Sequence, residues 1–331
     1  MIKKNYKLIL AYNIKLNKLF FSVFIIMENK KLKIIAGPCS VNFKNIEEIY
    51  HIADIKINGR YCIWGTRVVG LKSRTTFYKD GKGMGIDFND YAKSIRRILK
   101  NKNLSQLKIF KSIKIAQKIY KETGLLIATE IMDPLIQPLL YENIIPKDKL
   151  LLWNPAVNQL GWPIFVMAQF IKRNKWYLGI KNPKWLGDYL KRADSKNYKD
   201  RTTVEKTWEG LVHYSGLEKE RIILIHRGVD IPEKRDCRNY PVHNLAMRIK
   251  QHTGCLLFFD PSHSHGPKMR EKILPATIKA MKMKIDDKNY LYDGILIEAG
   301  NSETDTEQHI IINELKILCK ELSKFRELEG R

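Results

Sequence analysis

Eight short apolar runs recur along the chain, and each one ends abruptly at glycine, proline or polar residues. Continuous apolar runs of this length are typical of strands buried on both faces, and such strands occur in parallel sheets that helices cover. The runs are KIIAGPC (33–39), YCIWGTRVV (61–69), LLIATEI (125–131), LLLWNP (150–155), WYLGIKN (176–182), RIILIHRG (221–228), LLFFDPSHSHG (256–266) and GILIEAG (294–300).

The segments between these runs have the apolar spacing of amphipathic helices. The first run is followed by NIEEIYHIADI, and the last run is followed by apolar residues at helical intervals, namely Ile311, Leu315, Leu318, Leu322 and Phe325. Alternating strands and helices that form eight units predict an α/β fold of the (β/α)8 (TIM) barrel type.

A single domain accounts for the length of the chain, because no Pro/Gly/Ser-rich linker divides its 331 residues. We place the barrel at residues 31–328 and treat residues 1–30 as an extension outside the core. Two connections, 87–123 and 184–204, are longer than a β/α unit needs, and we expect them to form insertions on the rim of the barrel.

Chemically active side chains follow nearly every run. Polar residues begin wherever a strand ends, and this is the better explanation for any single position. In parallel barrels, however, the active site lies on the loops after the carboxyl ends of the strands, and so many such groups on one rim favour a functional site. They are Cys39, Arg67, Glu130, Asn154, Lys181, His226, Arg227, Asp260, His263 and Glu298.

One group of these residues could bind a metal. Cys39, His263 and Glu298 follow the first, seventh and eighth runs, which become neighbours when the barrel closes, and Asp305 lies in the next loop. A thiolate, an imidazole and two carboxylates suit one divalent transition metal, such as Mn, Fe, Co or Zn. The alternative is that the cysteine is a small core residue and the histidine a hydrogen-bonded structural residue.

A second group is cationic, and its members follow apolar runs instead of lying on one helical face. Guanidinium groups bind oxyanions through two parallel hydrogen bonds, and an ammonium group supplies a compact positive charge. The group therefore predicts a phosphorylated, multiply anionic substrate. Its members are Arg67, Lys72, Arg74, Lys181 and Arg227.

The net charge of +24 is the usual mark of a nucleic-acid-binding protein. Here the basic residues are spread along the chain and accompany abundant isoleucine and asparagine. Since lysine, isoleucine and asparagine have A/T-rich codons, genome composition explains much of the charge, and we expect no specific nucleic-acid binding.

The five cysteines lie far apart without a C-x-x-C pair, which suits a reducing compartment and predicts a cytoplasmic protein. LFFSVFIIM (19–27) is apolar for only nine residues, whereas a membrane span needs roughly 20. No small-residue cleavage site follows it. We therefore expect no membrane span, and an N-terminal extension instead of a secretory signal.

Seven motifs occur in the order and spacing of the phosphoenolpyruvate-condensing aldolases: IIAGPCS, TRVVGLKSRT, GLLIATE, GIKNP, IHRG, DPSHSHG and IEAG with TDTEQ. Over about residues 32–320 the chain most resembles the 3-deoxy-7-phosphoheptulonate synthase family. The resemblance implies condensation of phosphoenolpyruvate with erythrose 4-phosphate to give 3-deoxy-D-arabino-heptulosonate 7-phosphate and phosphate, the first step of the shikimate pathway to the aromatic amino acids. It also implies a homo-oligomer.

The resemblance further implies a role for each matching residue. Cys39, His263, Glu298 and Asp305 match the metal ligands. Arg67, Lys72, Lys181 and Arg227 match the residues that bind phosphoenolpyruvate, and Arg74 with Thr75 matches the part that binds the phosphate of erythrose 4-phosphate. Lys72 lies between the two substrates, while Asp260 and His263 in DPSH place an acid beside a metal-binding imidazole, so these three are the expected catalytic residues.

The sequence departs from the family pattern in three places. Val157 in Pro155-Ala156-Val157 replaces an arginine that contacts phosphoenolpyruvate, Ser73 replaces a proline, and the spacing from Glu298 to Asp305 is shorter. Two alternatives therefore stay open. One is a related synthase for another aldose, as in KDO 8-phosphate synthase, and the other is a noncatalytic sugar-phosphate-binding homologue.

Overall fold

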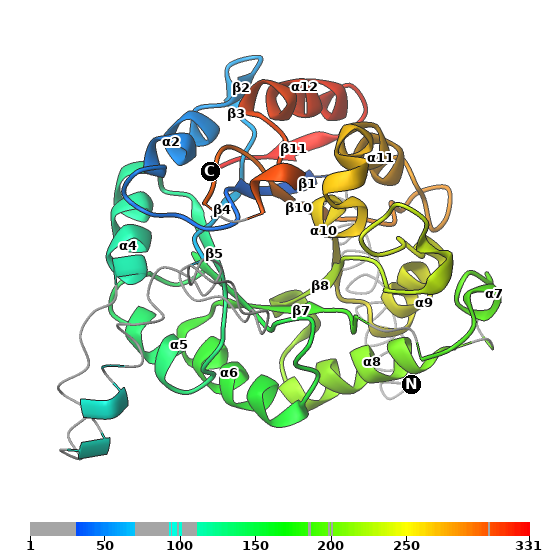
Figure 1. The fold of residues 1–331 in the computed structure, drawn as a ribbon, viewed down its shortest axis with the longest axis horizontal. Coiled ribbons are helices and arrows are strands. Elements are labelled where there is room, and N and C mark those ends of the chain that lie inside the picture. Colours follow the sequence, from blue (N-terminus) through cyan, green and yellow to red (C-terminus); the bar gives the residue numbers. More distant parts are fainter. Residues whose placement is uncertain are drawn as a thin grey trace, which may run out of the picture.

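A computed structural model of the chain describes residues 31–69, 93, 95–97, 99–100, 111–184, 187–197, 199, 201–303 and 305–331. All eight predicted runs contain a strand, and these strands form a closed parallel barrel that is surrounded by helices (Figure 1). The barrel strands are β1 (Lys31–Gly37), β4 (Gly65–Arg67), β5 (Leu126–Glu130), β6 (Leu150–Trp153), β7 (Tyr177–Lys181), β8 (Ile222–His226), β9 (Leu256–Phe259) and β10 (Gly294–Glu298).

The strands follow one another around the barrel in chain order, and β10 pairs with β1 to close it. Since every pairing in the ring is parallel, the carboxyl ends of all eight strands meet at one rim. The predicted (β/α)8 barrel is therefore confirmed.

The helices lie around the outside of the barrel (Figure 1). Where they cover the barrel, one face is apolar: α8, for example, buries Val204, Trp208 and Leu211. The α-helices are α2 (Ile46–Ala53), α4 (Lys111–Thr123), α5 (Ile136–Tyr141), α6 (Gly161–Asn174), α7 (Leu190–Ala193), α8 (Thr203–Ser215), α9 (His243–Thr253), α10 (Pro261–His265), α11 (Ile273–Met281) and α12 (Ile312–Ser323). Short 3₁₀ helices are η2 (Lys219–Arg221), η3 (Pro232–Lys234), η4 (Pro267–Lys272) and η5 (Thr306–Gln308).

Buried apolar side chains form two separate clusters. The larger one fills the layer between strands and helices, and the smaller one fills the inside of the barrel. Trp153 is the largest fully buried side chain of the inner cluster. Gly179 on the neighbouring strand makes room for it, because a β-carbon there would lie 2.7 Å from the β-carbon of Trp153. The inner cluster gives the polar rim a solid apolar floor.

A short strand near the C-terminus, β11 (Glu327–Glu329), was not predicted. It pairs in parallel with the first three residues of β1, so that Lys33 is paired with β10 on one side and with β11 on the other. The hairpin of β2 (Lys56–Ile57) and β3 (Arg60–Tyr61) lies nearby, and the guanidinium of Arg331 stacks 3.9 Å from the ring of Tyr61. Residues 327–329 are thus packed against β1, the first strand among the described residues.

The two predicted rim insertions are described in part. The stretch 87–123 ends in α4, and 184–204 contains α7. Residues 1–30 and the predicted site residues Lys72, Arg74 and Thr75 lie outside the described residues. In the part of the chain that is described, every helix is too short or too polar to cross a membrane.

Candidate active site

The carboxyl rim of the barrel buries an unusual number of charged side chains. Arg67, Lys181, Arg227, Asp260 and Glu298 are each less than a tenth exposed. Burying a charge is costly unless it is paired or bound to a ligand. The buried charges at the rim therefore cost stability, which indicates that they bind a ligand or take part in a reaction.

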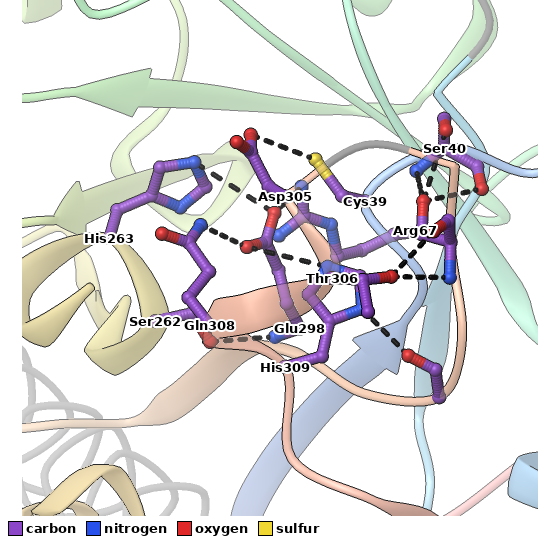
Figure 2. A network of polar contacts seen from close by, with 12 residues as sticks. Cys39, Ser40, Arg67, Ser262, His263, Glu298, Asp305, Thr306, Gln308 and His309 are labelled. Carbon is purple, nitrogen blue, oxygen red and sulfur yellow. Dashed lines mark hydrogen bonds and ion pairs between the residues drawn. The ribbon is translucent and has the colours of Figure 1, made fainter. Parts of the chain in front are cut away.

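Glu298, at the end of β10, is the centre of the rim. Its Oε1 forms an ion pair with Arg67 Nη2 at 2.9 Å and lies 3.8 Å from His263 Nε2. Its Oε2 accepts a hydrogen bond from Gln308 Nε2 and lies 3.8 Å from His309 Nε2. Figure 2 shows these side chains converging on the carboxylate from β4, α10 and the loop after β10.

A potential metal site lies beside this carboxylate. The ligand atoms of Cys39, Glu298 and His309 lie within 4.8 Å of one another, and all three residues are buried. Asp305 adjoins them, because its Oδ2 accepts a hydrogen bond from Cys39 Sγ at 3.5 Å. A thiol, carboxylates and imidazoles are a donor set that fits a divalent transition metal.

The structure thus brings all four predicted metal ligands into one network, and it adds His309, which was not predicted. Cys39 and Glu298 belong to the compact group of three. His263 and Asp305 lie at its edges, next to Glu298 and Cys39 respectively. His309 was not predicted because it does not follow a strand directly, and only the path of the loop after β10 brings it to the rim.

His263 is held by Asp260, the acid that ends β9. Asp260 accepts hydrogen bonds from the backbone N–H of His263 at 3.1 Å, as the N-cap of α10, and from its ring Nδ1 at 3.0 Å. Because a carboxylate can only accept, Nδ1 carries the proton, and Nε2 keeps the lone pair on the side of Glu298. DPSH therefore ends the strand with a cap that also orients an imidazole.

Charges in the rim are strongly coupled. Burial opposes ionisation of Asp260, but the charge and hydrogen bond of His263, then the charges of Lys181 and Arg67, outweigh it and lower its pKa to about 2. Burial lowers the pKa of His263, although Asp260 and Glu298 act in the opposite direction. Asp260 is consequently a carboxylate at neutral pH.

The loops after β1 and β10 are tied together, which holds Cys39 beside Asp305. The backbone N–H of Ser40 donates to Ser302 Oγ at 3.0 Å, and Asn45 Nδ2 donates to the carbonyl oxygens of Ser40 and Asn301. Asp305 itself has a left-handed backbone (φ 54°), which turns the loop back toward the rim.

Two asparagines position the cations. Asn154 Oδ1, at the end of β6, accepts from the backbone N–H of Lys181 at 2.9 Å, and Asn182 Oδ1 accepts from that of Arg227 at 2.8 Å. Each asparagine therefore fixes the end of the next strand around the barrel. The predicted cations Arg67, Lys181 and Arg227 all lie at this rim and are buried.

The indole of Trp153 lies next to two of these cations. The ring centroid is 5.8 Å from Arg67 Cζ and 5.2 Å from Lys181 Nζ, which is within the range of cation–π attraction. Val157, which stands where the resemblance implies an arginine, is 55% exposed. Trp153 is thus a neighbour of the cations that the sequence did not single out.

Several buried donors in this region lack a hydrogen-bond partner among the residues that the structure describes. They are Arg67 Nε and Nη1, Arg227 Nε and Trp153 Nε1. Leaving a buried donor unsatisfied costs about 1–3 kcal/mol, and more when the group is charged. Native proteins seldom tolerate this without a ligand or water to complete the hydrogen bonds, so the arrangement favours a bound anion.

A second buried arginine–glutamate pair shows the contrast. Arg248 Nε and Nη2 donate to the two oxygens of Glu205 at 2.8 Å, Nη2 also donates to the carbonyl oxygen of Ala193 at 2.9 Å, and Nη1 donates to that of Ser195. This pair joins α8 to α9, to the last residue of α7 and to the segment after it, and every nitrogen of its guanidinium is satisfied. Arg67 is equally buried, but its Nε and Nη1 have no hydrogen-bond partner among the described residues, as expected of a residue that binds a ligand.

We expect anion binding at the rim to weaken at alkaline pH. Burial, together with the charges of Arg67 and Arg227, lowers the pKa of Lys181, and Glu130 and Asp260 only partly oppose this. The ammonium is present below its pKa, so the affinity of the rim for a probe anion such as phosphoenolpyruvate should fall as pH rises through a value below the ordinary lysine range. Calorimetric titration between about pH 7 and 10 measures this decline.

Lys181→Arg is the matched control, because a guanidinium stays protonated throughout this range. Its affinity for the probe anion should change less with pH than that of the wild type. Identical pH profiles for the two proteins would contradict a role for the Lys181 charge in binding.

Comparison with known proteins gives a match at the level of fold. No protein-family model and no curated protein sequence matches the chain. Among solved structures, it matches phospho-2-dehydro-3-deoxyheptonate aldolase (DAHP synthase) from Thermotoga maritima, with 17% identity and a TM-score of 0.60 over 89% of this chain and 69% of that one. A truncated form of 3-deoxy-D-arabino-heptulosonate 7-phosphate synthase from the same organism matches with 16% identity and a TM-score of 0.58, over 89% of this chain and 87% of that one. The fold implied by the sequence motifs is therefore confirmed: this chain has the barrel fold of the DAHP synthases.

Proposed function

We propose that this protein is a metal-dependent synthase that condenses phosphoenolpyruvate with a phosphorylated aldose, with erythrose 4-phosphate as the expected partner substrate. The observation that supports this most is a set of buried donors on Arg67, Arg227 and Trp153 that have no hydrogen-bond partner within the described part of the chain and lie beside the thiol, carboxylate and imidazole groups. An anion site next to a metal site suits a phosphorylated substrate that reacts with a polarised carbonyl.

In this proposal Arg67, Lys181 and Arg227 bind the carboxylate and phosphate of phosphoenolpyruvate. Lys72, Arg74 and Thr75, which lie outside the described residues, act on the aldose as the motif implies. The metal, when bound, polarises the aldehyde oxygen. Cys39, His263, Glu298 and Asp305 are the proposed ligands, and Asp260 keeps the His263 ring in the tautomer that binds through Nε2.

The proposed condensation needs no oxidant or reductant. The electron pair of the enol double bond forms the new carbon–carbon bond to the aldehyde carbon, and the aldehyde oxygen takes up a proton. Water adds to the former enol carbon, which becomes a ketone as inorganic phosphate leaves. The buried cations stabilise the charge on the departing phosphate.

The five cysteines, all within the described part of the chain, are thiols and not disulfides. This suits a reducing compartment such as the cytoplasm, where we propose that the enzyme acts. The homo-oligomeric state implied by the resemblance stays a prediction.

The proposal is tested with the full chain, stripped of metal by a chelator and then supplied with Mn²⁺, Fe²⁺, Co²⁺ or Zn²⁺. We expect loss of the enol absorbance of phosphoenolpyruvate and release of equimolar phosphate in the presence of erythrose 4-phosphate. The stripped protein should be inactive. Consumption with arabinose 5-phosphate instead would identify a synthase for another aldose.

The noncatalytic alternative has its own signature. A protein that binds metal and phosphoenolpyruvate, but consumes the latter with no phosphorylated aldose and none of the four metals, is a binding homologue. That result would overturn the proposed activity and leave the anion site intact.

A further inference from the structure

His309 is anchored so that one ring nitrogen faces the metal site. Its Nδ1 lies 2.7 Å from the carbonyl oxygen of Gly300. A carbonyl oxygen can only accept, so Nδ1 carries the proton, and in the neutral ring Nε2 carries the lone pair. Histidines that bind a metal through one ring nitrogen usually donate the N–H of the other to a carboxylate, a backbone carbonyl or water. His309 makes a hydrogen bond of this kind.

The backbone around His309 is fixed as firmly as the ring. Residues 299 and 310 form a parallel bridge, in which the Ile310 N–H donates to Glu298 O at 3.1 Å and the Gly300 N–H donates to Ile310 O at 3.0 Å. His309 therefore follows the end of β10 as part of an added strand pairing. This pairing places it next to Glu298, and the side chain is only 4% exposed.

The distances fit ligands of one ion better than direct hydrogen bonds. His309 Nε2 lies 3.8 Å from Glu298 Oε2, which is too long for a hydrogen bond. Two ligand atoms that each lie about 2.0–2.2 Å from a metal are separated by roughly 3–4 Å. Gln308 Nε2 donates to the same Oε2 and so holds the carboxylate in this orientation.

We infer that His309 is a metal ligand together with Cys39 and Glu298, so that the site contains two imidazoles, one on each side of the Glu298 carboxylate. His263 faces Oε1 and His309 faces Oε2. The inference rests on the metal dependence in the proposed function. It also narrows the choice of metal, because a thiolate with two imidazoles favours Zn²⁺, Co²⁺ or Fe²⁺ over Mn²⁺.

Cobalt is the probe for the test, since Co²⁺ bound to a thiolate gives a charge-transfer band and shifts the nuclear resonances of its ligands. Each bound histidine whose Nδ1–H is protected should give one exchangeable, strongly shifted N–H signal. We expect two such signals in the Co²⁺-loaded wild type. His309→Gln should remove one of them and weaken Co²⁺ binding by at least 10–100-fold, while the thiolate band persists in the bound fraction.

His243→Gln is the matched control, because His243 is a half-buried imidazole whose Nδ1 contacts Tyr292 Oη and which does not belong to the ligand group. It should keep both signals and the wild-type affinity for Co²⁺. Unchanged Co²⁺ affinity and an unchanged number of shifted signals in His309→Gln would overturn the inference. If His309→Gln does not fold, His263→Gln decides the matter: the shifted signal of His309 should remain in that variant, and its absence would overturn the inference.

This outcome is separable from the fate of the proposed function. Two imidazole signals in a protein that turns over no substrate would keep His309 as a ligand and reject the synthase. An active synthase in which His309→Gln keeps the wild-type signals and Co²⁺ affinity would do the reverse.

Discussion

Replacing Glu298 with glutamine is expected to abolish metal binding and to destabilise the barrel at the same time. The carboxylate contacts Arg67, His263, Gln308 and His309. An amide is a poor metal ligand, and loss of a ligand should cost more than the 10–100-fold affinity change seen when supporting residues are removed. The amide also leaves the guanidinium of Arg67 buried without its charge partner, which typically costs about 3–5 kcal/mol.

Two measurements check this prediction. Co²⁺ titration reports the loss of binding, and urea unfolding of the metal-free protein reports the loss of stability, so that the second does not depend on the first. Glu321→Gln is the control, because Glu321 pairs with Lys324 on the surface of α12. It should leave both quantities unchanged. Wild-type metal affinity in Glu298→Gln would remove Glu298 from the ligand set.

Arg248→Ala is expected to cause a comparable loss of stability without any effect on the site. The variant leaves Glu205 as an unpaired buried charge and removes the hydrogen bonds to the carbonyl oxygens of Ala193 and Ser195. We expect the free energy of unfolding to fall by about 3–5 kcal/mol. Co²⁺ affinity of the folded protein should equal that of the wild type.

The double variant Glu205→Leu/Arg248→Met distinguishes the cost of leaving Glu205 as an unpaired buried charge from the cost of losing the hydrogen bonds of Arg248. Apolar side chains of similar volume can replace a buried ion pair at little cost or with a gain, so the double variant should be more stable than Arg248→Ala. Metal affinity that falls together with stability would show that the two buried pairs are not independent.

The fold could be predicted from the sequence because strand burial leaves a direct trace. Runs such as LLFF and GILIE are apolar on both faces since one face meets the inner cluster and the other meets the helices. The side chains at the end of such a run must lie on the rim, which is why the place of Cys39, Lys181 and Glu298 at the rim could be predicted from the order of the runs.

Residues brought to the rim by a folded loop could not be found in this way. His309 is separated from β10 by a turn at Asp305 and by η5, and in the sequence it is a single histidine before an amphipathic helix. Trp153 occupies an expected strand, but an apolar run does not reveal that its ring faces two cations. The three residues of β11 alternate two glutamates with a leucine and give no strand signal unless the edge of β1 is known.

The double pairing of β1 has a consequence for how this chain is made. Lys33 pairs with Gly294 of β10 and with Glu329 of β11. The pairings of β1 therefore cannot be completed until these later strands have been synthesised. Pairings between distant segments slow folding, and an unpaired strand edge invites association with other chains. During synthesis the growing barrel is therefore an open sheet with an exposed edge. Until β10 and β11 have been made, that edge is open to pairing with other chains.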